Sequence, residues 1–187
     1  MADGARAPGV PLGLLTLPNA ITFARLCAVP LAVWLVLRDD LGAAFGLFVA
    51  AGATDAVDGW LARHGRASSV GAILDPVADK VLLVSMYVTL ASIDVLPDWI
   101  AILVVFRDLL IVGGVLLLGV AGQPVSIRPL FISKVNTALQ ILLVAAALLL
   151  AELGVPARGV IAPLLWVVAA TTLVSGAAYV RRTAWLR

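Results

Sequence analysis

The sequence predicts an all-α integral membrane protein, built as a bundle of six transmembrane helices with both termini in the cytoplasm. Hydrophobic residues make up 63% of the chain and charged residues only 13%, and the mean hydropathy is +1.11. Soluble domains have about 45–50% apolar residues, so this composition excludes an ordinary soluble domain. A chain of 187 residues has room for about six spans of roughly 20 residues with short connections.

Turn-forming residues divide the apolar sequence into six stretches. Clusters of Gly, Pro, Asp and Arg separate each stretch from the next, as is typical of turns. The connecting segments are Arg38-Asp39-Asp40, His64-Gly65-Arg66, Asp94 to Asp98, Gly122 to Pro129 and Gly154-Val155-Pro156. The predicted helices cover residues 20–37, 41–62, 75–93, 98–119, 135–151 and 159–180. Residues 1–16 are predicted to form a polar N-terminal tail, and residues 17–187 a single six-helix domain.

The distribution of basic residues predicts the orientation in the membrane. With the N-terminus in the cytoplasm, eight Lys and Arg residues of the connecting and terminal segments lie on the cytoplasmic side and two on the other. Membrane proteins carry such an excess on the cytoplasmic side. No run of basic residues is typical of a nucleic-acid surface. The eight are Arg6, Arg63, Arg66, Arg128, Lys134, Arg181, Arg182 and Arg187, and the two are Arg38 and Arg158.

Four aspartates interrupt the apolar sequence where the second predicted helix ends and the third begins. Asp55 and Asp58 are spaced i, i+3, and Asp75 and Asp79 are spaced i, i+4, so each pair shares one helical face. Carboxylates in a membrane are costly unless they are paired or bind a metal. Their hard oxygen ligands favour Mg²⁺, Mn²⁺ or Ca²⁺ over zinc. If the faces meet, two such ions can support displacement at phosphorus.

Small residues and an arginine accompany the aspartates. Gly59 and Ala62 keep one face of the second helix narrow, and Arg63 offers donors suited to a phosphate group. Taken alone, the small residues also fit close helix packing in a membrane. Their fixed spacing among four aspartates favours a binding site on the cytoplasmic side.

The pattern Asp55-x-x-Asp58-Gly59-x-x-Ala62-Arg63, followed by Gly71-x-x-x-Asp75-x-x-x-Asp79, resembles the signature of the CDP-alcohol phosphatidyltransferases. The segment Leu17 to Arg25 also resembles the start of that family's first helix. The resemblance implies transfer of the phosphatidyl group from CDP-diacylglycerol to an alcohol, with release of CMP. It implies a homodimer in the bacterial inner membrane, with the active site facing the cytoplasm among membrane lipids.

The resemblance also assigns roles to individual residues. The four aspartates would hold two divalent ions, Mg²⁺ or Mn²⁺, and Asp79 would also be the base that takes the proton of the acceptor hydroxyl. A carboxylate at the edge of the cavity is chemically suited to that step. The residues that would bind CDP-diacylglycerol are Asp55, Gly59, Ala62, Arg63 and Gly71.

Charged residues in the fourth and fifth predicted helices bear on the acceptor. Arg107 and Asp108 lie inside the fourth helix, and Lys134 precedes the fifth. Arg107 can form an internal salt bridge with Asp108 or a motif carboxylate. Alternatively, Arg107, Arg128 and Lys134, together with Arg25, hold the phosphate of an anionic acceptor. Both interpretations can hold together.

The acceptor itself has two candidates. The segments 106–111 and 131–140 resemble the eukaryotic-type cardiolipin synthases, whose acceptor is phosphatidylglycerol. The alternative is a phosphatidylglycerophosphate synthase, which uses glycerol 3-phosphate. A cation transporter and an intramembrane prenyltransferase are rival classes. However, the sequence shows neither an internal repeat nor a second, distant aspartate motif.

Overall fold

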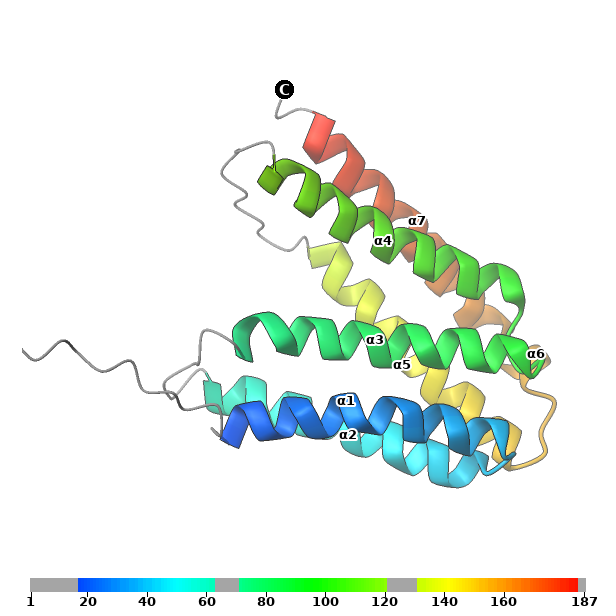
Figure 1. Cartoon of the computed structure of the whole chain (residues 1–187). Coiled ribbons are helices and arrows are strands. Elements are labelled where there is room, and N and C mark those ends of the chain that lie inside the picture. The colour runs from blue at the N-terminus through cyan, green and yellow to red at the C-terminus, as the bar shows by residue number, and fades with distance from the viewer. Residues whose placement is uncertain (1–16, 63–70, 121–130, 185–187) are drawn as a thin grey trace, which may run out of the picture.

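The computed structural model describes the backbone of residues 17–62, 71–120 and 131–184, and the side chains of residues 23–54, 78–114, 131–156 and 159–181. Every regular element in these ranges is a helix, which confirms the all-α prediction (Figure 1). Six are long and one has four residues. The helices are α1 (Leu17–Leu37), α2 (Leu41–Ala62), α3 (Gly71–Ser92), α4 (Asp98–Val120), α5 (Phe131–Glu152), α6 (Ala157–Val160) and α7 (Ala162–Ala184).

The predicted helix boundaries hold to within about four residues, and α2 has the predicted bounds. Helices α3 and α5 each begin four residues earlier than predicted, at Gly71 and Phe131. The last predicted helix is divided, because α6 ends at Val160 and α7 begins at Ala162. This break puts Pro163 in the first turn of α7, where a missing N–H costs no helical hydrogen bond. The predicted tail, residues 1–16, lies outside the described residues.

Three of the connections share one turn geometry. Asp39, Asp94 and Gly154 follow α1, α3 and α5, and their φ angles are 63°, 62° and 65°. The next residue in each turn donates its backbone N–H to a carbonyl five residues back, at 3.0 Å in every case. This left-handed C-terminal turn satisfies carbonyls that the helix end would otherwise leave open. All three turns lie at the same end of the bundle, at the right of Figure 1.

The helices pack around α5 and α3. Helix α1 packs against both α2 and α3, α5 contacts α2, α3 and α7, and α4 packs against α3 and α7. The core is filled by apolar side chains with almost no exposed surface, including Met86, Leu90, Ile100, Leu143 and Val168. Tyr87 is also fully buried, and its hydroxyl donates to the backbone oxygen of Gln140 at 3.2 Å.

The Glu152 carboxylate joins the end of α5 to the start of α2 by a hydrogen bond, near the three turns. Glu152, the last residue of α5, accepts a hydrogen bond of 2.7 Å from the backbone N–H of Gly42 in the first turn of α2. A negative charge is favourable at a helix N-terminus, which carries unsatisfied N–H groups. A Cβ atom at position 42 would lie 3.0 Å from this carboxylate, so glycine permits the close approach.

The distribution of polar and apolar side chains differs from that of a soluble protein, although the core is apolar. Large apolar side chains face outward, and Ile102, Leu109 and Trp166 have about two thirds of their surface exposed. Charged and amide side chains lie inside. The buried polar residues are Arg25, Thr89, Arg107, Asp108, Asn136, Gln140, Thr172 and Ser175. Among the described residues, the helices Phe131–Glu152 and Ala162–Arg181 are long and apolar enough to cross a membrane.

We expect the stability of the bundle to depend on small residues at its helix contacts, and two adjacent alanines on α7 test this. Ala169 is buried in the core, whereas Ala170 is exposed. Ala169→Leu should lower the melting temperature in detergent, because an overpacked core costs about 1–3 kcal/mol. Ala170→Leu is the matched control, since it makes the same change one residue away. Equal melting temperatures for the two variants would contradict the described packing.

Candidate active site

The two halves of the aspartate motif lie at one end of the bundle. Asp55 and Asp58 are in the last turns of α2, whereas Gly71 is the first residue of α3 and Asp75 the fifth. Helix α2 ends and α3 begins at the same end, opposite the three left-handed turns (Figure 1). The side chains of Asp55, Asp58, Gly59, Ala62, Arg63, Gly71 and Asp75 lie outside the described part. Their convergence therefore stays a prediction.

Asp79 is the motif carboxylate whose side chain the structure describes. Its side chain has 48% of its surface exposed, so one side of the carboxylate faces open space. Its Oδ1 accepts a hydrogen bond of 3.2 Å from Nη1 of Arg25, a side chain on α1 that is only 1% exposed. An arginine buried among apolar helices requires an anionic or hydrogen-bonding partner. Arg25 therefore ties α1 to α3 at the carboxylate that the sequence predicts as the base.

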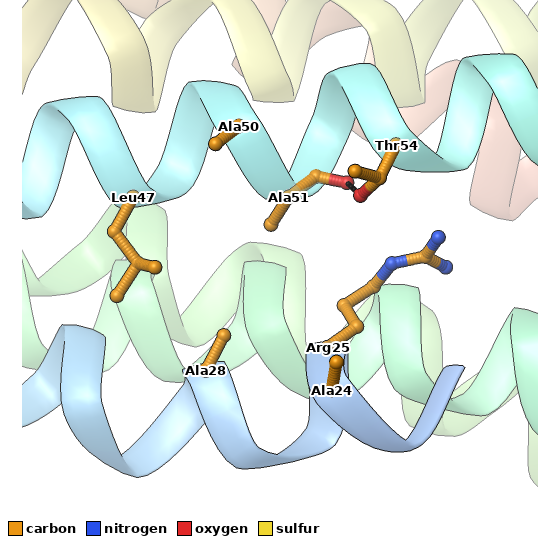
Figure 2. A pocket seen from close by; sticks show the side chains of 7 residues that line it. All are labelled: Ala24, Arg25, Ala28, Leu47, Ala50, Ala51 and Thr54. Carbon is orange, nitrogen blue, oxygen red and sulfur yellow. Dashed lines mark hydrogen bonds between the residues drawn. The ribbon is translucent and has the colours of Figure 1, made fainter. Parts of the chain in front are cut away.

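A groove of about 360 Å³ runs between α1 and α2 (Figure 2). Small side chains keep it open, and Figure 2 shows Arg25 extending along it past Thr54. The Thr54 hydroxyl donates to the backbone oxygen of Ala51 at 2.8 Å. Thr54 directly precedes Asp55, the first aspartate of the motif. The lining residues are Ala24, Arg25, Ala28, Leu47, Ala50, Ala51 and Thr54.

A second group of charges lies on the other side of α3, and we call it the Asp108 cluster: Lys80, Arg107, Asp108, Ser133 and Ser175. Asp108 accepts from Arg107 Nη1 at 2.7 Å on Oδ1 and from Lys80 Nζ at 2.8 Å on Oδ2. Nη2 of Arg107 donates to Ser133 Oγ at 2.5 Å and to Ser175 Oγ at 2.6 Å. The cluster thereby joins α3, α4, α5 and α7.

Further hydrogen bonds join α5 to α7. Asn136 Oδ1 accepts from the hydroxyls of Thr171 and Thr172, each at 2.8 Å. Gln140 Nε2 donates to Thr172 Oγ1 at 3.4 Å. Buried polar side chains need such partners because an unsatisfied group is costly in an apolar interior. These bonds fix the register of α5 on α7.

Three of the four predicted acceptor residues have described side chains, and the structure places Arg25 and Arg107 in different groups. Arg25 lies beside Asp79, and Arg107 lies in the Asp108 cluster. Lys134 is exposed in the first turn of α5, and Arg128 lies outside the described residues. The predicted internal salt bridge between Arg107 and Asp108 is confirmed. Sequence reasoning missed Lys80 and Ser175, although the position of Lys80 directly after Asp79 was an available signal.

The donor set of the motif suits a hard cation. In the part of the chain with described side chains, no group of three or more His, Cys, Asp or Glu residues forms a metal site. The half-exposed Asp79 carboxylate belongs to a motif whose fixed positions hold four aspartates and neither histidine nor cysteine. Carboxylate oxygens are the ligands that magnesium and manganese ions take in proteins.

Comparisons with known proteins identify relatives over most of the chain. A rice protein named CDP-diacylglycerol–glycerol-3-phosphate 3-phosphatidyltransferase 1, chloroplastic, is 39% identical over 184 residues, which cover 88% of this chain and 56% of the rice protein. Human cardiolipin synthase (CMP-forming) is 34% identical, over 71% of this chain and 50% of its own length. The chain thus spans about half the length of these relatives.

A bacterial relative matches nearly end to end. The Bacillus subtilis CDP-diacylglycerol–glycerol-3-phosphate 3-phosphatidyltransferase is 33% identical, over 89% of this chain and 94% of its own length. A sequence model of the CDP-alcohol phosphatidyltransferases matches residues 15–174, which include α1 to α5, the whole aspartate motif and half of α7. The chain belongs to the CDP-alcohol phosphatidyltransferase family.

Proposed function

We propose that this protein is a membrane-embedded phosphatidyltransferase of phospholipid biosynthesis. It would transfer the phosphatidyl group of CDP-diacylglycerol to an alcohol and release CMP. The observation that carries the proposal is the complete aspartate motif within the family match, with Asp79 half exposed in the first half of α3. Family membership also favours phosphoryl chemistry over the transporter and prenyltransferase alternatives.

The proposed reaction is a displacement at the phosphatidyl phosphorus. The acceptor oxygen bonds to that phosphorus as the bond between phosphorus and the CMP oxygen breaks, and Asp79 takes the acceptor proton. The carboxylate has the exposure that this step requires, because a base must come within hydrogen-bond reach of the hydroxyl. Arg25 holds one carboxylate oxygen from the α1 side and so orients Asp79.

Asp55, Asp58, Asp75 and Asp79 would together hold two divalent ions, Mg²⁺ or Mn²⁺. Bound ions of this kind neutralise charge on the pyrophosphate and on the leaving CMP. The residues that would bind the cytidine and the diphosphate are Gly59, Ala62, Arg63 and Gly71. Arg63 would donate hydrogen bonds to the phosphate oxygens. The groove between α1 and α2 supports this placement, since one of its lining residues, Thr54, directly precedes Asp55 in the sequence.

Six helices of the domain 17–187 would span the membrane, with both termini and the active site on the cytoplasmic side of a bacterial inner membrane. The outward-facing apolar side chains and the buried polar residues support this placement. The hydrocarbon of a membrane solvates apolar side chains, but it cannot solvate polar ones. The excess of cytoplasmic Arg and Lys supports the orientation. The family resemblance supports a homodimer.

The acceptor would be phosphatidylglycerol, giving cardiolipin, with glycerol 3-phosphate as the second candidate. The resemblance of the segments 106–111 and 131–140 favours the first. The names of the rice and Bacillus relatives favour glycerol 3-phosphate, and the name of the human relative favours phosphatidylglycerol. Arg25, Arg107, Arg128 and Lys134 would supply positive charge for the phosphate of either acceptor.

We expect each motif aspartate to be indispensable for turnover. Replacing Asp55, Asp58, Asp75 or Asp79 by Asn should reduce CMP release from CDP-diacylglycerol by at least about a hundredfold, because each change removes an anionic ligand from the proposed metal site. Removing divalent ions from the wild-type protein should have the same effect. Asp39→Asn is the matched control, because Asp39 lies in the turn after α1, at the end of the bundle away from the motif. Its backbone is in a left-handed conformation that Asn also tolerates. Turnover in metal-free buffer would contradict the two-ion proposal.

The orientation is testable by cysteine labelling. Cys27 is the single cysteine of the chain, so Cys27→Ala gives a background free of thiols. A membrane-impermeant maleimide added to right-side-out vesicles should label a cysteine introduced at Asp94 but not one introduced at Ser68. Inverted vesicles should give the reverse result. Labelling of both positions from one side would contradict the six-span topology.

Product analysis identifies the acceptor. Purified protein with CDP-diacylglycerol should be offered phosphatidylglycerol, glycerol 3-phosphate, inositol phosphate and serine in separate reactions. We expect cardiolipin from phosphatidylglycerol. Lys134→Ala should raise the acceptor KM about tenfold, since a hydrogen bond to a charged group contributes about 1.5–3 kcal/mol. A lipid with a terminal phosphate, formed only from glycerol 3-phosphate, would instead establish a phosphatidylglycerophosphate synthase.

A further inference from the structure

The Asp108 cluster contains more positive than negative charge. Its charged members are two cations, Lys80 and Arg107, and one carboxylate, Asp108. The side chains of Asp108 and Arg107 are 7% and 4% exposed, so this ion pair lies in the interior of the bundle, and Lys80 reaches it from a partly exposed position. An excess charge in such surroundings is costly unless an anion compensates it. The cluster is therefore suited to receive one more negative group.

The two cations differ in their freedom to meet that group. Arg107 is fixed, because its two Nη atoms already donate to Asp108, Ser133 and Ser175. Lys80 makes one described hydrogen bond, and 34% of its side-chain surface is exposed. Its ammonium group carries three donors on a flexible stem. Lys80 can therefore turn to an incoming anion while Arg107 continues to neutralise Asp108.

Lys80 is also placed beside the reacting centre. It follows Asp79 on α3, and consecutive residues of an α-helix point about 100° apart. Asp79 accordingly contacts α1 through Arg25, whereas Lys80 contacts α4 through Asp108. Both side chains are partly exposed at the same level of α3. A molecule with a hydroxyl at Asp79 can thus present a nearby phosphate to Lys80.

We propose that Lys80 binds the phosphate ester of the acceptor alcohol, exchanging its contact with Asp108 for one with the phosphate. This inference rests on the proposed function and deepens it, because it assigns an acceptor-binding residue on the same helix as the base. Without acceptor, Asp108 is the partner of Lys80. When Lys80 turns to the phosphate, Asp108 stays paired with Arg107. The shared ligand chemistry is an anionic phosphate ester, as present in both phosphatidylglycerol and glycerol 3-phosphate.

Steady-state kinetics of the full-length protein test this assignment. CMP release should be measured for Lys80→Gln and Lys80→Arg, with phosphatidylglycerol in one arm and glycerol 3-phosphate in the other. Lys80→Gln should raise the KM of the acceptor that the wild type uses by about ten- to a hundredfold. The KM for CDP-diacylglycerol should change by less than about twofold, a margin of under half a kcal/mol. Lys80→Arg should recover most of the loss.

The control removes one positive charge elsewhere. Arg181 is an exposed cation near the end of α7, so Arg181→Gln should leave both KM values unchanged. If Lys80→Gln releases no CMP, equilibrium binding of the used acceptor without CDP-diacylglycerol should still be weaker by at least tenfold than in the wild type. An acceptor KM and affinity unchanged by Lys80→Gln would overturn the assignment, as would equal increases in both KM values. A wild-type protein inactive with every acceptor would overturn the proposed function itself.

Discussion

The structure depends on the need to neutralise charged side chains within an apolar helical bundle. Arg107 and Asp108 are almost completely buried and lie 2.7 Å apart. Two serines, from α5 and α7, take the remaining Nη donor of Arg107. Moving either charge away would leave the other without its partner in surroundings that cannot solvate it. The serine hydrogen bonds of Arg107 therefore join α4 to α5 and α7, in addition to the Asn136 bonds that join α5 to α7.

The same need explains where the bundle can carry open polar groups. At the end with the three left-handed turns, backbone bonds and the Glu152 carboxylate satisfy the helix termini. In the half of α3 nearer the other end, Asp79 and Lys80 keep partly exposed side chains although each has a partner within the bundle. The two ends thus differ in function. One closes the bundle, and the other keeps the charged groups that the proposed reaction would use.

Sequence reasoning recovered the helices because their ends are chemically marked. Asp39 and Gly154 tolerate the left-handed conformation that ends a helix, so the boundaries next to them are close to the predicted ones. The start of α3 was predicted four residues late, at Asp75 instead of Gly71. Asp75 does not mark the start of the helix, because the apolar residues 72–74 before it continue the helix without any turn signal. Pro163 marked the break before α7, and the prediction passed over it.

The candidate site was less predictable, because its contacts join helices far apart in the sequence. Asp108 was recognised as a partner of its neighbour Arg107, but its bond to Lys80 spans 28 residues. The bond of Arg107 to Ser175 spans 68 residues. Spacing along one helix reveals which residues share a face, but not which face of another helix meets it. The aspartates could be found because their pairing lies within single helices.

The position of Asp79 and Lys80 on one helix constrains any acceptor. Because both residues lie on one helix, the distance between their backbones is fixed, and the distance between their charged groups changes only within the reach of the flexible Lys80 stem. In the proposed reaction, an acceptor must match that distance with its hydroxyl and its phosphate. Phosphatidylglycerol and glycerol 3-phosphate share this three-carbon arrangement, so α3 alone would accept both. Selection between them must then depend on what surrounds the far side of the phosphate, where one acceptor carries a diacylglycerol group and the other carries none.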